Sequence, residues 1–147
     1  MPYEQLVQQG RIKLYEARPE EIRKLLKVAA RDLATAERNL ADDHDWAYTI
    51  AYNAVLQAAR ALMLAKGFRP RGVESHATVV RFVEEALGKG YASQIALFDQ
   101  MRRKRHRVIY EVAGLVSKQE AEQGIVFARK FVEEIRLLIS KQASLKL

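Results

Sequence analysis

Apolar residues recur every three or four positions along most of this chain, and this spacing constrains the fold more than any other feature. Such a period places apolar side chains on one side of an α-helix, whereas a strand requires alternation at every second residue. The pattern therefore predicts amphipathic helices that pack on one another. In the first long segment the apolar positions are Ile22, Leu25, Leu26, Ala29, Leu33, Ala36 and Leu40.

Start and stop signals divide the chain into five predicted helices. Pro19 suits the first turn of a helix, and Ser117 with Glu120 forms the pattern of a capping box. Alanine recurs through the second helix, which we therefore expect at the centre, because small side chains allow neighbouring helices to approach closely. The predicted helices cover about residues 18–40, 45–67, 75–88, 91–114 and 117–141.

Length and composition favour one domain with one core. The chain has 147 residues, 49% of them hydrophobic, with few glycines and prolines and no cysteine. We predict an all-α, up-and-down antiparallel bundle of about five helices that spans residues 1–147. It comprises a short N-terminal segment at 1–17, a core at 18–141 and a frayed tail at 142–147. Since neither a signal peptide nor a membrane span is recognisable, we expect a cytoplasmic protein.

The positive charge is concentrated in one segment of the fourth predicted helix. Five of the cations lie within residues 102–107, and removing them from the net charge of +7 leaves only +2. Arginine forms bidentate contacts with phosphate, and a nearby tyrosine can stack on a base. We therefore predict a site for RNA or nucleotide phosphate. Its residues are Arg102, Arg103, Arg105, Arg107 and Tyr110.

A simpler interpretation is a solvated basic helix whose arginines pair with acidic neighbours such as Asp99 and Glu111. The three histidines do not show the spacing of a metal site, so we predict no metal and no cofactor. His44 is assigned to a helix cap, and His76 to the first turn of the third helix. Aromatic packing in the core is the expected role of Trp46, Tyr48 and Tyr52.

Three segments are distinctive in their order along the chain: the Ala-Tyr-Thr-Ile-Ala-Tyr-Asn-Ala sequence at 47–54, the alanine-rich segment 59–69 and the basic segment 102–110. Together they resemble the HEPN family (higher eukaryotes and prokaryotes nucleotide-binding domains). The resemblance covers about residues 22–138. It implies a helical bundle that dimerises with its motif helices facing one another. It also implies a toxin–antitoxin pair with a minimal nucleotidyltransferase as the partner protein.

Active HEPN ribonucleases carry an arginine followed, after four to six residues, by a histidine. Ahead of His106 the corresponding positions are Asp99, Gln100 and Met101, so this spacing is not met. Counting forward from Arg103 instead places Val108 at the histidine position and Tyr110 at the position of a motif tyrosine. In related pairs that tyrosine accepts a nucleotide from the transferase, which makes Tyr110 a candidate acceptor.

The leading prediction is a HEPN-like module that binds RNA or nucleotide phosphate and forms a homodimer through its fourth helix. One alternative is a metal-independent endoribonuclease toxin, with Arg105 and His106 as catalytic residues. Valine cannot transfer a proton and a tyrosine hydroxyl is a poor base at neutral pH, so binding is placed before cleavage. The other alternative is a non-catalytic bundle whose basic helix docks an acidic protein.

Overall fold

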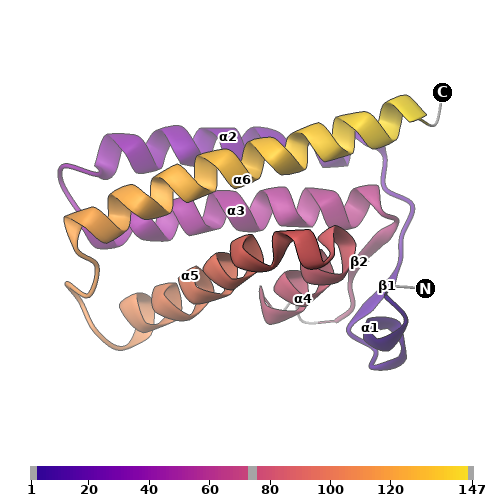
Figure 1. The fold of residues 1–147 in the computed structure, drawn as a ribbon, viewed down its shortest axis with the longest axis horizontal. Coiled ribbons are helices and arrows are strands. Elements are labelled where there is room, and N and C mark those ends of the chain that lie inside the picture. The colour runs from indigo at the N-terminus through magenta and orange to yellow at the C-terminus, as the bar shows by residue number, and fades with distance from the viewer. Residues whose placement is uncertain (1–2, 73–75, 146–147) are drawn as a thin grey trace.

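A computed structural model of the protein describes residues 3–72 and 76–145. Five long helices make up most of it (Figure 1), which confirms the predicted all-α bundle. No helix in the described ranges is both long and apolar enough to cross a membrane. The long helices are α2 (Pro19–Asn39), α3 (His44–Ala65), α4 (His76–Leu87), α5 (Ala92–Tyr110) and α6 (Lys118–Leu145).

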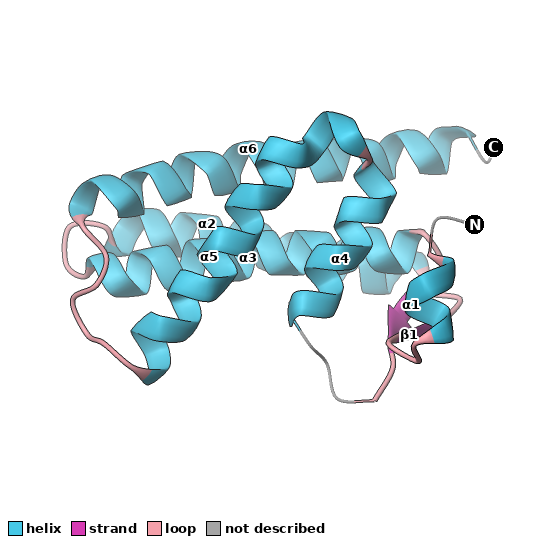
Figure 2. Ribbon diagram, turned by 60° about the horizontal axis from the view of Figure 1, so that its bottom comes forward, coloured by secondary structure: helices cyan, strands magenta, loops and turns pink. Residues whose placement is uncertain are grey.

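Helix α3 lies at the centre of the bundle, where it contacts α2, α4, α5 and α6. In Figure 1, α2, α3 and α6 run side by side, and Figure 2 shows α4 and α5 together on one side of these three helices. The alanines of α3 explain its position, because small side chains let the neighbouring backbones approach. The completely buried alanines of this helix are Ala47, Ala51, Ala54, Ala58, Ala59 and Ala61.

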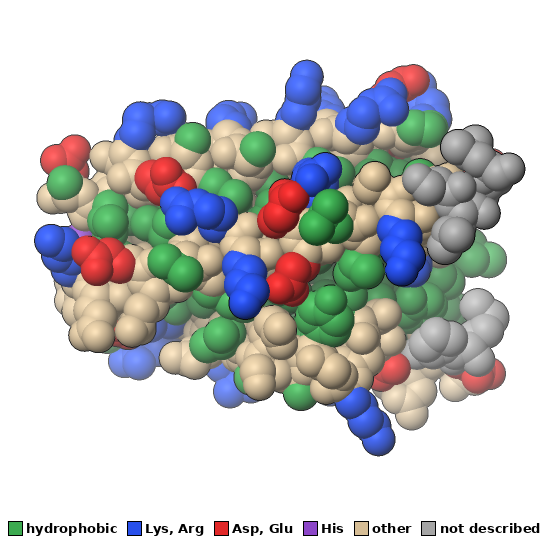
Figure 3. Space-filling view, turned by 45° about the horizontal axis from the view of Figure 1, so that its top comes forward, with side chains coloured by type: hydrophobic (Ala, Val, Ile, Leu, Met, Phe, Trp, Pro, Cys, Tyr) green, Lys and Arg blue, Asp and Glu red, His purple; other side chains and the backbone are tan. Residues whose placement is uncertain are grey.

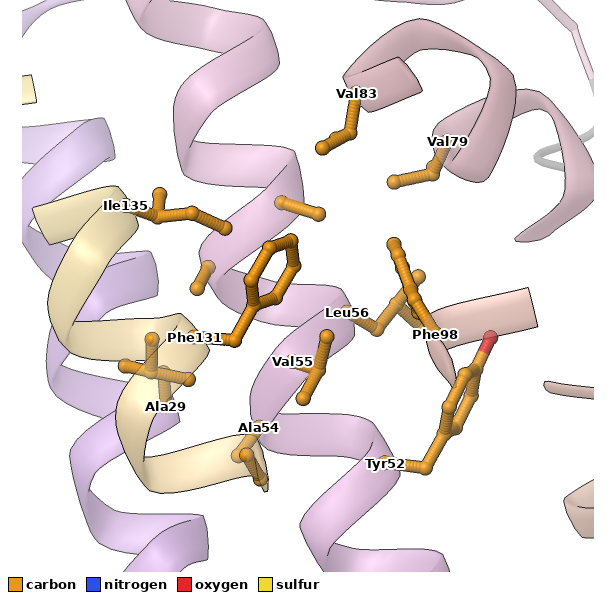
Figure 4. Close-up of a cluster of buried hydrophobic side chains, with 14 of the residues drawn as sticks. Ala29, Tyr52, Ala54, Val55, Leu56, Val79, Val83, Phe98, Phe131 and Ile135 are labelled. Atoms are coloured by element: carbon orange, nitrogen blue, oxygen red, sulfur yellow. The ribbon is translucent and has the colours of Figure 1, made fainter. Parts of the chain in front are cut away.

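The core between α3, α5 and α6 is aromatic. Phe98 of α5, Phe131 of α6 and Val55 of α3 lie in one buried apolar cluster (Figure 4), and the centroids of the two rings lie 6.2 Å apart. Tyr52 packs beside Phe98 at 6.0 Å and is buried, as the sequence predicted. Trp46 is different, since 56% of it is exposed at the start of α3, so its predicted core role was wrong.

The sequence did not predict three short elements near the N-terminus and the α3–α4 connection. They are α1 (Glu4–Gln8) and two strands, β1 (Ile12–Leu14) and β2 (Phe68–Pro70), which pair in an antiparallel register that sets Lys13 opposite Arg69. A further single turn, η1 (Lys89–Tyr91), joins α4 to α5. In Figure 1, β2 lies at the opposite end of the bundle from the last turns of α5, so Arg69 does not extend the basic segment.

Helices α2, α3 and α6 begin where their capping signals predicted, but two helix ends differ. Ser117 Oγ accepts from the Glu120 N–H at 3.1 Å and Glu120 Oε1 accepts from the Ser117 N–H at 3.2 Å, which completes the capping box. Helix α5 ends at Tyr110 rather than at Gly114. Helix α6 continues to Leu145, beyond the predicted core boundary at 141. The expected start of the third helix at Ser75 falls outside the described residues.

The buried hydroxyl of Tyr48 should make the stability of the bundle depend on pH in the alkaline range. Burial beneath α6, and secondarily the charge of Glu120, raises the pKa of Tyr48 to about 12. An unfolded tyrosine ionises near pH 10, so the unfolded state loses its proton first and stability falls as pH rises from 10 to 12. We expect a loss of about 2–3 kcal/mol over this range, measured by urea unfolding. Tyr48→Phe should lack this component; identical pH profiles for the two proteins would contradict the assignment.

Candidate functional site

The cationic segment lies in the second half of α5, where the helix leaves the centre of the core. Ile95, Phe98 and Met101 are buried on one side of the preceding turns. Because an α-helix turns once every 3.6 residues, residues 102–107 then point in all directions around the axis. The structure divides the cations of this segment into an outer group and an inner group, and it pairs His106 with the exposed ring of Tyr110.

The outer group consists of Arg103, Lys104 and Arg107, which line a surface depression with Asp99 and Gln100. Arg103 is 72% exposed, and its Nη2 lies 3.0 Å from Asp99 Oδ2. Arg107 makes a longer contact of 3.6 Å between Nε and Glu111 Oε2, with both side chains exposed. Such exposed pairs are weak, so these two arginines can exchange their partners for phosphate at little cost.

Lys104 differs from its neighbours because it joins two helices. Its ammonium group forms an ion pair with Glu120 in the first turn of α6, and only 20% of its side chain is exposed. This hydrogen bond, followed in strength by that from the Ser117 N–H, lowers the pKa of Glu120 below its ordinary value. Lys104 therefore fixes α5 against α6, and it was not among the predicted phosphate ligands.

The inner group is Arg102 and Arg105, one turn apart on the helix. Arg102 Nε donates to Asp99 Oδ1 at 2.8 Å. The Arg105 guanidinium carbon lies 5.9 Å from the centroid of the Tyr52 ring, within the range of a cation–π contact. Within residues 3–72 and 76–145, Arg105 makes no ion pair with a carboxylate. Its charge is thus held against an aromatic face and remains uncompensated by any described acid.

Tyr52 contacts both Arg105 of α5 and a residue of α4, the third predicted helix. Its hydroxyl lies 3.0 Å from His76 Nδ1, so α3, α4 and α5 each supply one member of a Tyr52, His76 and Arg105 cluster. The sequence placed His76 correctly in the first turn of a helix. It gave no indication that His76 approaches the basic segment, because the three residues belong to different helices.

His106 and Tyr110 form the aromatic pair. Their ring centroids are 4.7 Å apart, and both side chains are exposed, Tyr110 by 67%. Spacings of three and seven residues put Arg103, His106 and Tyr110 on the same side of α5. The predicted site residues therefore do not converge in one cleft within the chain. Arg105 contacts Tyr52 toward the bundle, whereas His106 contacts Tyr110 on the surface.

A carboxylate from a distant helix binds the segment that follows α5. Asp45 in the first turn of α3 accepts hydrogen bonds from the N–H groups of Gly114 at 2.6 Å and Val116 at 3.0 Å. Gly114 has a φ of 74°, which a residue with a side chain rarely adopts. These contacts attach the segment between α5 and α6 to the first turn of α3.

Removing the Asp45 carboxylate should release this connection. We expect Asp45→Ala to destabilise the protein by about 1–3 kcal/mol, since two backbone donors lose a charged acceptor. Amide hydrogen exchange should accelerate at Gly114 and Val116 while the core of α3 stays protected. Asp42→Ala, an exposed change in the preceding turn, is the matched control. Unchanged exchange at both amides would show that the loop does not depend on Asp45.

The described residues contain no group of three or more histidines and acids that could hold a metal ion.

The fold and its basic helix define an all-α bundle with a cationic, partly aromatic surface on α5. The family model of the HEPN domain matches residues 22–138, and the chain belongs to this family.

Two solved structures share the fold. ST0689, described as an archaeal HEPN homologue, is 17% identical with a TM-score of 0.62, and the match covers 81% of this chain and 98% of that one. TT1696 from Thermus thermophilus is 19% identical with a TM-score of 0.59, covering 79% and 96%. At these identities the likeness shows the fold alone. No curated protein matches the chain with statistical significance.

Proposed function

We propose that this HEPN domain binds RNA or nucleotide phosphate through α5. The observation that carries the proposal is the local charge balance. Four of the five cations of residues 102–107 pair with three carboxylates, Asp99, Glu111 and Glu120; two arginines share Asp99, and Arg105 pairs with no acid of the described residues. Elsewhere the signs are mixed, as on the face in Figure 3, where acidic and basic side chains are interspersed. A positive excess beside exposed aromatic rings favours a phosphate-bearing ligand with bases that can stack.

Fluorescence anisotropy of a labelled single-stranded RNA tests this proposal. We expect the triple variant Arg103→Gln, Arg105→Gln, Arg107→Gln to weaken binding by more than about tenfold, since each arginine contributes a phosphate contact. The matched control removes three exposed cations from α2, through Arg23→Gln, Lys24→Gln and Lys27→Gln. Equal losses in the two triple variants would refute a specific role for α5 and leave only nonspecific charge.

A protein contact at the end of α5 is a second candidate function, which a different observation favours. Trp46, Ile109 and Val112 are exposed apolar side chains close to Tyr110, and Trp46 and Ile109 line one pocket. We propose that this end contacts a second copy or a nucleotidyltransferase partner in a cytoplasmic toxin–antitoxin pair. Light scattering on wild type and Ile109→Glu distinguishes these occupants. Loss of a dimer supports the homodimer, whereas a monomer that co-purifies with a transferase supports the heteromeric pair.

Tyr110 is the proposed nucleotide acceptor in such a pair. Its hydroxyl oxygen would bond to the α-phosphorus of ATP, pyrophosphate would leave, and the phenolic proton would pass to water. The exposure of Tyr110 supports this role, because a transferase must reach the oxygen. Incubation with the cognate transferase and ATP, followed by mass spectrometry, should reveal a nucleotide adduct that Tyr110→Phe lacks. A wild-type protein without an adduct contradicts the proposal.

A further inference from the structure

The short ladder of β1 and β2 places two cations directly opposite each other. Lys13 and Arg69 are partners in the antiparallel register, so both side chains leave the same face of the ladder. Both are exposed, and neither forms an ion pair with a carboxylate of residues 3–72 or 76–145. Like charges that face each other across a ladder are destabilising, and an anion between them removes the repulsion.

The two cations line a pocket of about 580 Å³ between the ladder, α2 and α3. Its apolar part consists of Leu25 of α2 with Met63 and Leu64 of α3. In Figure 1 the ladder lies at the opposite end of the bundle from the last turns of α5. The pocket is therefore separate from the basic segment, and it combines a cationic wall with an apolar one, as small-molecule sites do.

Tyr15 holds the Arg69 side chain in place. The guanidinium carbon of Arg69 lies over the Tyr15 ring, 4.9 Å from its centroid, which is the geometry of a cation–π contact. The Tyr15 hydroxyl in turn donates to Glu21 Oε1 at 2.6 Å. A cation–π contact uses no hydrogen-bond donor, and the Arg69 side chain forms no hydrogen bond within the described residues. Its N–H groups thus remain available to an anion.

Glu21 is the acidic residue of the pocket, and its two oxygens already have donors. Oε1 accepts from Tyr15, and Oε2 accepts from the Arg18 N–H at 2.7 Å. These bonds, that from Tyr15 first, lower the pKa of Glu21 below its ordinary value. The carboxylate therefore positions Tyr15 instead of pairing with Lys13 or Arg69.

The number of unpaired charges indicates the class of anion. A phosphate monoester carries a charge of about −1.5 to −2 at pH 7, whereas a carboxylate or a backbone phosphodiester carries a single negative charge. Two neighbouring cations without a described acid match the monoester. An arginine fork also suits its oxygens, because these accept two parallel N–H groups.

We propose that this pocket binds a small phosphate monoester with an apolar body. Lys13 and Arg69 contact the phosphate, Tyr15 is a positioning residue for Arg69, and the apolar body lies against Leu25 and Met63. The inference is independent of RNA binding by α5, since the two sites share no residue.

An NMR titration with phenyl phosphate, which joins a dianionic phosphate to an apolar ring, tests this proposal. Lys13→Gln and Arg69→Gln should each weaken binding about tenfold, because each removes a charged contact. Lys66→Gln, an exposed change near β2 but outside the pocket, is the matched control and should have no effect. Tyr15→Leu should weaken binding about twofold to fivefold, and Tyr15→Phe, which keeps the ring, should restore it.

Two further comparisons identify the ligand class and the site. Benzoate has the same ring with a single charge, and it should bind about tenfold more weakly than phenyl phosphate. The α5 triple variant should bind phenyl phosphate as wild type does. Tight binding of benzoate overturns the assignment to a monoester, and a loss confined to the α5 variant places the anion elsewhere and overturns the site.

The wild-type protein decides the matter even where a variant fails to fold. Phenyl phosphate should shift the backbone amide resonances of Lys13 and Arg69, while that of His106 stays still. Absent shifts at these two amides, or equal losses in Lys66→Gln and Arg69→Gln, contradict the proposal. None of these outcomes bears on RNA binding, which the anisotropy assay measures separately.

Discussion

Raising the NaCl concentration from 50 to 200 mM should weaken RNA binding by about twentyfold to fiftyfold. Each phosphate that a cation neutralises releases part of a condensed counterion, and for single strands the slope of log affinity against log salt is about −0.7 per contact. Three contacts from Arg103, Arg105 and Arg107 give about a twentyfold loss, and a fourth from Arg102 gives about fiftyfold. The measured slope therefore counts the arginines that bind phosphate.

The same titration with the α5 triple variant is the control. Removing Arg103, Arg105 and Arg107 should flatten the slope as well as lower the affinity, because fewer counterions are released. The α2 triple variant should retain the wild-type slope. An affinity that is independent of salt would show that α5 makes no phosphate contacts, whatever the affinity itself is.

The helices and the cationic segment could be predicted because their signals are local. The apolar period of α2 and the capping box at Ser117 each act within a few residues, where propensity and capping decide the backbone conformation. The basic segment is contiguous, so its excess charge was evident without the fold. The structure added the division of that segment, with Lys104 tied to Glu120 and Arg105 turned toward Tyr52.

Features that depend on distant partners were missed. Each strand has only three residues, and β1 pairs with β2 more than 50 residues later, so neither carries a recognisable alternation. The fourth helix was extended to Gly114 because the apolar pattern continues past Tyr110. The segment that follows Tyr110 is instead bonded to Asp45, whose carboxylate belongs to another helix. His76 was likewise placed on its helix but not in contact with Tyr52, since only packing joins α3 and α4.

The packing of α2 against α3 should depend on a half-buried hydrogen bond to Asp32, a carboxylate that Arg31 also contacts. Asp32 of α2 is 6% exposed, and its Oδ2 accepts from Asn53 Nδ2 of α3 at 2.6 Å, next to Tyr52 in the sequence. We expect Asn53→Ala to lower the free energy of unfolding by about 2–3 kcal/mol, because a buried carboxylate loses a donor that water cannot fully replace. Urea denaturation at pH 7 measures the change.

Two comparisons isolate the effect of this bond. Gln57→Ala removes a longer 3.3 Å contact to Asn53 Oδ1 on the same side of α3, and should cost less than about 1 kcal/mol. The double variant Asp32→Ala, Asn53→Ala should be less destabilised than the sum of its single variants, since removing both partners leaves neither side chain with an unsatisfied polar atom at this contact. Strict additivity would contradict a coupling between α2 and α3 at this point.

Because Asn53 contacts Asp32 and not Arg105, the folded fraction of Asn53→Ala should bind RNA as wild type does.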